Sequence, residues 1–179
     1  MSRWTAPQEY LTILPKIRVL LLGSFAPKVK LESIRDGLKQ KGITNCQTTK
    51  NFNSPLQTEG EPEHLYNLRK SEYWLRRADV FVFVFFKGVD NASVGIELEK
   101  TLSQMPGNAW RTILAYEESA PSLVRALGIR FSPDISVVPF SDDVELQKQV
   151  CGNIIRMLER FYSSVLIRPI GEWENSSIL

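Results

Sequence analysis

Residues 80–86 read VFVFVFF, an apolar run with no polar position on either face of an extended strand. Such a strand needs apolar cover on both faces, as the central strand of a parallel sheet has. The run is also far too short to cross a bilayer. It therefore predicts a sheet buried between two layers of helices, and no membrane-spanning segment.

The rest of the chain alternates apolar runs with segments of helical period. We expect strands at residues 17–25, 45–52, 79–86, 110–118 and 135–141, and helices at residues 31–42, 64–78, 93–104, 120–128 and 142–162. Strands that alternate with helices over short connections predict an α/β fold, a flavodoxin-like or Rossmann-like three-layer sandwich with a five-stranded parallel sheet.

The expected domain organisation is a single α/β domain at residues 17–162. Residues 1–16 form an N-terminal arm and residues 163–179 a C-terminal tail. The arm is either packed on the domain or is an extension that binds a partner, and the sequence leaves both interpretations open.

Charge and composition exclude several classes of protein. The net charge is +2 and the basic residues are spread along the chain, which argues against a nucleic-acid binder or a polybasic membrane anchor. Two cysteines (Cys46 and Cys151) and one histidine (His64) make a structural zinc site improbable. No signal peptide is recognisable at the N-terminus. We expect a cytoplasmic protein without a metal or a bound cofactor.

Ligands of open parallel sheets bind beyond the carboxyl ends of the strands. The loops expected there are residues 23–30, 51–57 and 87–93. The first has neither the G-x-G-x-x-G pattern nor a P-loop, but Gly23 permits close approach of the backbone to a ligand, and Lys28 or Lys30 could meet a phosphate. The alternative is a tight strand exit with solvated lysines.

The loop at residues 87–93 leads into the helix that carries Glu97. Asp90, Asn91 and Ser93 are residue types that cap helices, whereas Glu97 has the wrong spacing for a capping box. Because helical side chains lean toward the N-terminus, Glu97 is expected to project toward the carboxyl edge of the sheet. An ionised carboxylate there could attack an anomeric carbon or bind ribose hydroxyls. The alternative is a surface glutamate stabilised by the helix dipole.

Three short motifs resemble the nucleoside 2-deoxyribosyltransferase superfamily, which is related to TIR-type domains. They are LLGSF (residues 21–25), RADVFVFVF (residues 77–85) and NASVGIELEKTL (residues 91–102). The resemblance implies that Glu97 is the catalytic nucleophile with Asp90 beside it, and that the substrate contacts Gly23, Ser24, Phe25, Asn91 and Ser93. The aromatic hydroxyl of the family's first strand is absent, and Glu72 or Tyr73 on the preceding helix are candidates to replace it.

The expected function is binding of a small-molecule nucleoside or nucleotide, with cleavage or transfer of an N-glycosidic bond by Glu97. The alternative is a non-catalytic module that senses a nucleotide or signals as TIR-type domains do. A third interpretation is an interaction domain anchored by terminal aromatics such as Trp4, Tyr10 and Trp173. Whether the chain forms a homo-oligomer is left open.

Overall fold

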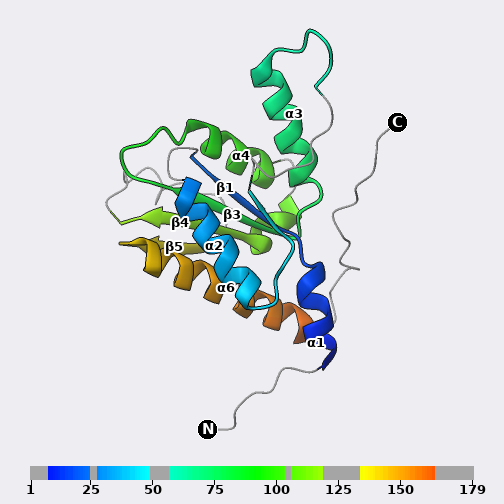
Figure 1. Ribbon diagram of the computed structural model, residues 1–179, viewed down its shortest axis with the longest axis vertical. Coiled ribbons are helices and arrows are strands. Elements are labelled where there is room, and N and C mark those ends of the chain that lie inside the picture. The colour runs from blue at the N-terminus through cyan, green and yellow to red at the C-terminus, as the bar shows by residue number, and fades with distance from the viewer. Residues whose placement is uncertain (1–7, 25–27, 49–56, 104–105, 119–133, 164–179) are drawn as a thin grey trace.

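The computed structural model describes residues 8–24, 28–48, 57–103, 106–118 and 134–163. Strands and helices alternate within these ranges (Figure 1). The strands are β1 (Val19–Gly23), β2 (Cys46–Thr48), β3 (Val80–Phe85), β4 (Thr112–Glu117) and β5 (Ser136–Phe140). The helices are α1 (Gln8–Ile13), η1 (Leu14–Lys16), α2 (Lys28–Gln40), α3 (Glu63–Leu75), α4 (Ala92–Ser103), η2 (Pro106–Arg111) and α6 (Asp143–Ser163). The helix expected at residues 120–128 lies outside the described residues.

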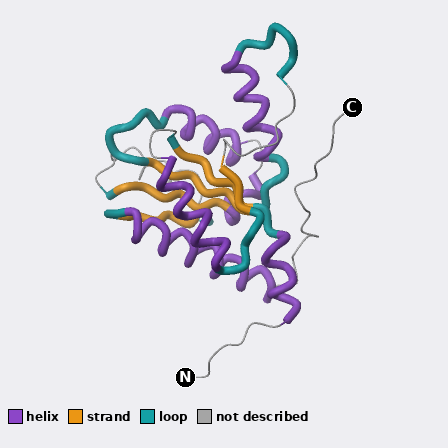
Figure 2. The backbone as a smooth tube through the Cα atoms, in the orientation of Figure 1, coloured by secondary structure: helices purple, strands orange, loops and turns teal. Residues whose placement is uncertain are grey.

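The five strands form one sheet in the order β2-β1-β3-β4-β5, and every neighbouring pair is parallel. Helices lie on both faces of the sheet (Figures 1 and 2). The predicted α/β three-layer sandwich with a five-stranded parallel sheet is therefore confirmed. No helix within the described ranges is both long enough and apolar enough to cross a membrane.

The apolar run of β3 supplies both cores, because its side chains alternate between the two faces of the sheet. Val82 and Val84 pack with α2 and α6 on one face, whereas Phe81 and Phe83 pack with α3 and α4 on the other. All four side chains have no measurable exposure to solvent. Burying one such side chain stabilises the fold by about 1.5–3 kcal/mol, so this strand is a large part of what holds the layers together.

The helices that follow β1 and β3 lie on opposite faces of the sheet. The helix that follows β1 (α2) belongs to one core and the helix that follows β3 (α4) belongs to the other, while β1 and β3 are neighbours, with Gly23 paired to Val84. Connections that leave adjacent strands in opposite directions open a crevice above the carboxyl ends of those strands. The edge at which ligands of such sheets bind is therefore the one above β1 and β3, which we call the ligand edge.

The N-terminal segment joins the domain before residue 17. Leu14, in η1, is only 5% exposed and packs in the core formed with α2 and α6. The described part of the arm therefore contributes to the fold at this residue, and residues 1–7 lie outside the described ranges.

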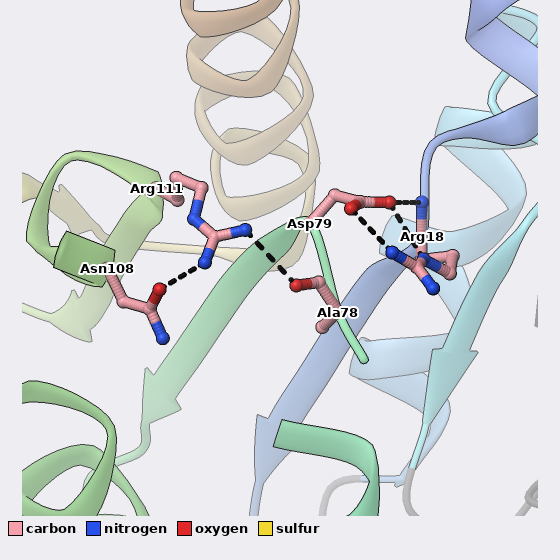
Figure 3. A network of polar contacts seen from close by, with 5 residues as sticks. All are labelled: Arg18, Ala78, Asp79, Asn108 and Arg111. Carbon is pink, nitrogen blue, oxygen red and sulfur yellow. Dashed lines mark hydrogen bonds and ion pairs between the residues drawn. The ribbon is translucent and has the colours of Figure 1, made fainter. Parts of the chain in front are cut away.

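Charged side chains join the strands at the opposite, amino edge of the sheet (Figure 3). Arg18, just before β1, donates through Nε and Nη2 to the two carboxylate oxygens of Asp79 at 2.9 and 2.8 Å, and its backbone N–H donates to Oδ2 at 3.0 Å. The Asp79 backbone N–H donates in return to the Arg18 carbonyl oxygen at 2.9 Å. Arg111, just before β4, donates to the Ala78 carbonyl oxygen at 3.4 Å and to the Asn108 side chain. Ala78 and Asp79, at the start of the RADVFVFVF motif, therefore link the strands at the edge of the sheet opposite the carboxyl ends.

Candidate functional site

The loop between β3 and α4 is closed by the side chain of Asn91. Its Nδ2 donates to the carbonyl oxygens of Phe86 and Val89 at 2.8 and 3.2 Å, and its Oδ1 accepts the backbone N–H of Phe86 at 3.3 Å. Gly88 has a φ of +72°, a left-handed conformation that glycine adopts at little cost. The side-chain amide nitrogen of Asn91 thus makes both of its hydrogen bonds within its own loop.

Asp90 and Asn91 also begin the helix α4. The Asp90 Oδ1 atom accepts the backbone N–H of Ala92 at 2.8 Å, and the Asn91 carbonyl oxygen accepts the N–H of Gly95 at 3.0 Å. Ser93 is exposed in the first turn. A carboxylate is favourable at this end of a helix because the unpaired N–H groups carry partial positive charge. The capping interpretation therefore accounts for the Asp90 contact in the structure.

The neighbouring strand β1 ends in a closely packed position. A Cβ atom on Gly23 would lie 3.1 Å from Leu31 Cδ2 and 3.4 Å from the Val84 carbonyl oxygen, so the absent side chain lets α2 approach β1. Ser24 follows at the ligand edge and is 9% exposed. Phe25, the third residue expected in this part of the pocket, lies outside the described residues.

Lys30, a candidate for contact with a phosphate, has a partner within the domain. Its Nζ atom lies 2.9 Å from Asp143 Oδ1 in α6 and 5.4 Å from the centre of the Phe86 ring. This ion pair is partly exposed, and such pairs contribute little to stability. The side chain of Lys28 lies outside the described part of the structure.

Glu97 lies in the second turn of α4 and reaches toward the C-terminal end of α3, where Trp74 and Leu75 pack in the same core as α4. The rest of α3 projects away from the sheet (Figure 1). The Ser71 hydroxyl on α3 donates to Glu97 Oε1 at 2.6 Å. Ser71 is buried, with 7% exposure, and Glu97 is partly buried. The candidate nucleophile is therefore held between two helices instead of standing free on the surface.

The surroundings of Glu97 oppose its ionisation. Burial raises the pKa of the Glu97 carboxyl group, while the hydrogen bond from Ser71 and the positive charge of Lys100 act to lower it. Lys100 in turn lies 2.6 Å from Glu72 of α3, so its charge is shared with a second carboxylate. An elevated carboxyl pKa in a partly buried position is typical of functional groups, although structural groups also show it.

The two residues considered as replacements for the missing aromatic hydroxyl make other contacts. Glu72 pairs with Lys100, and the guanidinium of Arg77 lies 3.6 Å from the centre of the Tyr73 ring. The hydroxyl that reaches Glu97 instead belongs to Ser71, which the sequence analysis missed. A signal was present: Ser71 occupies the same helical face as Trp74, Leu75 and Ala78, all of which are buried. A serine on a stripe that faces the core is worth testing as the partner of a buried polar group.

The structure brings the predicted site residues together only in part. Gly23, Ser24, Asp90 and Asn91 all lie at the carboxyl ends of β1 and β3. The backbone of Glu97 lies about 7.5 Å farther along the axis of α4 than that of Ala92, at 1.5 Å per residue. Within the described residues, the hydrogen bond made by its side chain goes to Ser71 and not to Asp90.

No group of three or more metal-ligating side chains is assembled within the ranges that the structure describes. The two cysteines do not take part in the site. Cys46 and Cys151 are free thiols buried in the core between the sheet, α2 and α6. Burial raises the pKa of the Cys46 thiol far above its usual range and that of the Cys151 thiol to about 11. Neither thiol is suited to act as a nucleophile at neutral pH.

No protein-family model matches the sequence, and no curated protein matches it significantly. Among solved structures, the chain is similar to a hypothetical protein from Thermus thermophilus, with 13% sequence identity and a TM-score of 0.45. The match covers 89% of this chain and 40% of that protein, so this chain spans less than half of its length. A functional assignment therefore depends on the contacts around Glu97 and on the motifs of the sequence.

Proposed function

We propose that this protein binds a nucleoside or nucleotide and cleaves or transfers its N-glycosidic bond, with Glu97 as the nucleophile. The observation that carries the proposal is the state of the Glu97 carboxylate. It is partly buried, and one oxygen, Oε1, accepts a hydrogen bond from Ser71, while no hydrogen bond to Oε2 is present within the described residues. A carboxylate held by one oxygen keeps the other for a ligand.

The chemistry requires an ionised carboxylate next to the sugar. Attack of a carboxylate oxygen on C1 of the sugar expels the base and forms a glycosyl ester, and a water or a second base then displaces the carboxylate. Both steps pass through an oxocarbenium-like transition state that negative charge stabilises. Because burial raises the pKa of Glu97, activity should increase with pH as this group ionises.

The fold supports a small ligand at this place. Gly23 and Ser24 end β1 next to the end of β3, where connections diverge to opposite faces of the sheet. In the proposed complex these residues border the sugar or its phosphate, and Asp90 and Asn91 border the base. We include a cytoplasmic location in the proposal, since Cys46 and Cys151 are free thiols.

A second candidate function is a non-catalytic module that binds a nucleotide, as in TIR-like signalling. It is favoured by the contacts of Asp90 and Asn91, whose side chains hold the loop and the helix start. Neither side chain is hydrogen-bonded to Glu97 within the described residues, so neither is engaged with the candidate nucleophile.

The decisive experiment measures base release and ligand binding separately. The purified chain is incubated with nucleosides, deoxynucleotides and NAD, release of the base is followed by chromatography, and binding is followed by calorimetry. Glu97→Gln should abolish release while retaining binding, because the amide cannot attack C1. Glu99→Gln is the matched control, since Glu99 is an exposed glutamate on the same helix.

Each outcome separates the two candidates. Release that is lost in Glu97→Gln and kept in Glu99→Gln supports the catalytic proposal. Binding without release by the native chain favours the non-catalytic module. Equal release by native chain and Glu97→Gln contradicts the role of Glu97, and absence of both release and binding across the panel contradicts both functions.

A further inference from the structure

We infer that Ser71 is the positioning residue for Glu97: it holds Oε1 and directs Oε2 toward the ligand. This inference rests on the proposed function, which names Glu97 as the nucleophile but does not say what orients it. Neither the motifs nor the expected site residues included Ser71. The hydroxyl comes from α3, a helix that precedes β3 and belongs to none of the ligand loops.

The contact has the geometry of a strong hydrogen bond. The distance of 2.6 Å from Ser71 Oγ to Glu97 Oε1 lies in the range of a hydroxyl that donates to an ionised carboxylate. Within the described residues, no other hydrogen bond is made by either side chain. The Ser71 hydroxyl has one proton to donate, and it is committed to Oε1.

The turns that carry the two residues are anchored in one hydrophobic core, so the contact can impose an orientation. Trp74 and Leu75, on the following turn of α3, are 4% and 3% exposed and pack in the core that includes Leu98 of α4. The ion pair between Lys100 and Glu72 forms a second link between α3 and α4 beside the first. Two polar links and a packed core thus hold the helix carrying the hydroxyl against the helix carrying the carboxylate.

The same contact affects which protonation state Glu97 adopts. The charged group that acts on it is Lys100 on its own helix, and Lys100 is paired with Glu72 of α3. A hydroxyl donor stabilises the ionised carboxylate, so its removal should raise the pKa of Glu97 further. A positioning role therefore predicts a change in the pH dependence of the reaction as well as in its rate.

The test compares Ser71→Ala and Ser71→Thr with the native chain. The pKa of Glu97 is measured by NMR of protein with ¹³C-labelled glutamate, and its resonance is assigned with Glu97→Gln. Base release is measured across pH with a substrate found in the panel. Ser103→Ala is the matched control, because Ser103 is exposed at the end of α4.

Ser71→Ala should raise the pKa of Glu97, move the acidic limb of the pH profile upward and lower kcat by about ten- to a hundredfold with little change in KM. Ser71→Thr keeps the hydroxyl and should restore both properties, and Ser103→Ala should change neither. Thermal unfolding shows whether each variant is folded.

An unchanged pKa of Glu97 in folded Ser71→Ala would overturn the inference. If Ser71→Thr does not fold, Ser71→Ala decides alone. The NMR measurement needs no turnover, so it still tests the Ser71 contact if the native chain releases no base. Failure of the proposed function is shown separately, by the absence of base release from the nucleosides, deoxynucleotides and NAD.

Discussion

At the scale of single residues, the burial of Glu97 opposes the ionisation that the proposed reaction requires. Its carboxylate is partly buried against α3 with one hydroxyl donor, in surroundings that favour the neutral acid. A folded-state pKa above the unfolded value means that the native protein binds the proton more tightly than the unfolded chain. Stability contributed by this group is then present at low pH and lost as pH rises through the raised pKa.

Glu97→Gln should therefore stabilise the protein at neutral and alkaline pH, by about 0.5–2 kcal/mol, because it removes a charge that burial penalises. The stabilisation should shrink as pH falls through the raised pKa of Glu97 and vanish below the ordinary pKa of glutamate, where both chains are neutral at this position. Urea unfolding across pH measures the free energy of unfolding of each chain. A difference that is independent of pH, or a less stable variant at neutral pH, would show that burial of charge is not the governing effect.

At the scale of elements, two helical glycines differ in the space around them. Gly37 of α2 faces α6, where a Cβ atom would lie 2.6 Å from Gln147 Nε2. That Gln147 nitrogen donates to the Ser33 carbonyl oxygen at 2.8 Å. Gly152 of α6 instead has open space around the position of its Cβ atom. Glycine is thus in close contact with a neighbouring side chain at one position and has open space at the other.

Gly152→Ala should stabilise the protein by about 0.5–1 kcal/mol, since alanine reduces the entropy of the unfolded chain without a steric cost. Gly37→Ala should lack this gain and lower stability by about 1 kcal/mol, because it displaces Gln147 from its hydrogen bond. Thermal unfolding of the two variants, which carry the same chemical change, measures the difference. Equal effects in both would mean that α2 and α6 do not pack as described.

Helix α6 also shows where a pattern misleads. The helical spacing of the apolar residues in this segment predicts Val144 on or near the buried face, but Val144 is 74% exposed, and Leu146 occupies the core position instead. Trp110 was expected in a strand, whereas it lies in η2 and is 40% exposed. Both errors fall at the ends of elements, where residue spacing alone does not show which side the neighbouring layer covers.

At the scale of the whole molecule, the two edges of the sheet have different roles. At the amino edge, neighbouring strands are linked by the Arg18–Asp79 ion pair, whose side chains are 18% and 19% exposed, and by the hydrogen bond from Arg111 to Ala78. The carboxyl edge carries the candidate ligand loops. Changes at the amino edge should therefore affect stability without touching the site.

Asp79→Ala should lower the free energy of unfolding by about 1–3 kcal/mol, because it removes the carboxylate that accepts three hydrogen bonds from Arg18. Asp36→Ala, which removes an exposed pair with Arg35, is the control and should change stability by less than about 0.5 kcal/mol. Denaturant unfolding gives both values. Ligand binding by folded Asp79→Ala should equal that of the native chain, and a weaker binding there would contradict the separation of the two edges.

The sequence by itself determined the layers of this protein and the order of its five strands and of the helices α2, α3, α4 and α6. An apolar strand such as β3 must be covered on both faces, and alternating strands and helices then leave a parallel sheet as the physical solution. It also placed Gly23, Asp90 and Glu97 correctly, because Gly23 ends one recognisable strand and the other two residues follow the end of another. What only the tertiary structure decided is which side chains meet. The link from Ser71 to Glu97 joins residues on two helices separated by a strand, and its existence depends on how α3 and α4 pack, which no local pattern encodes.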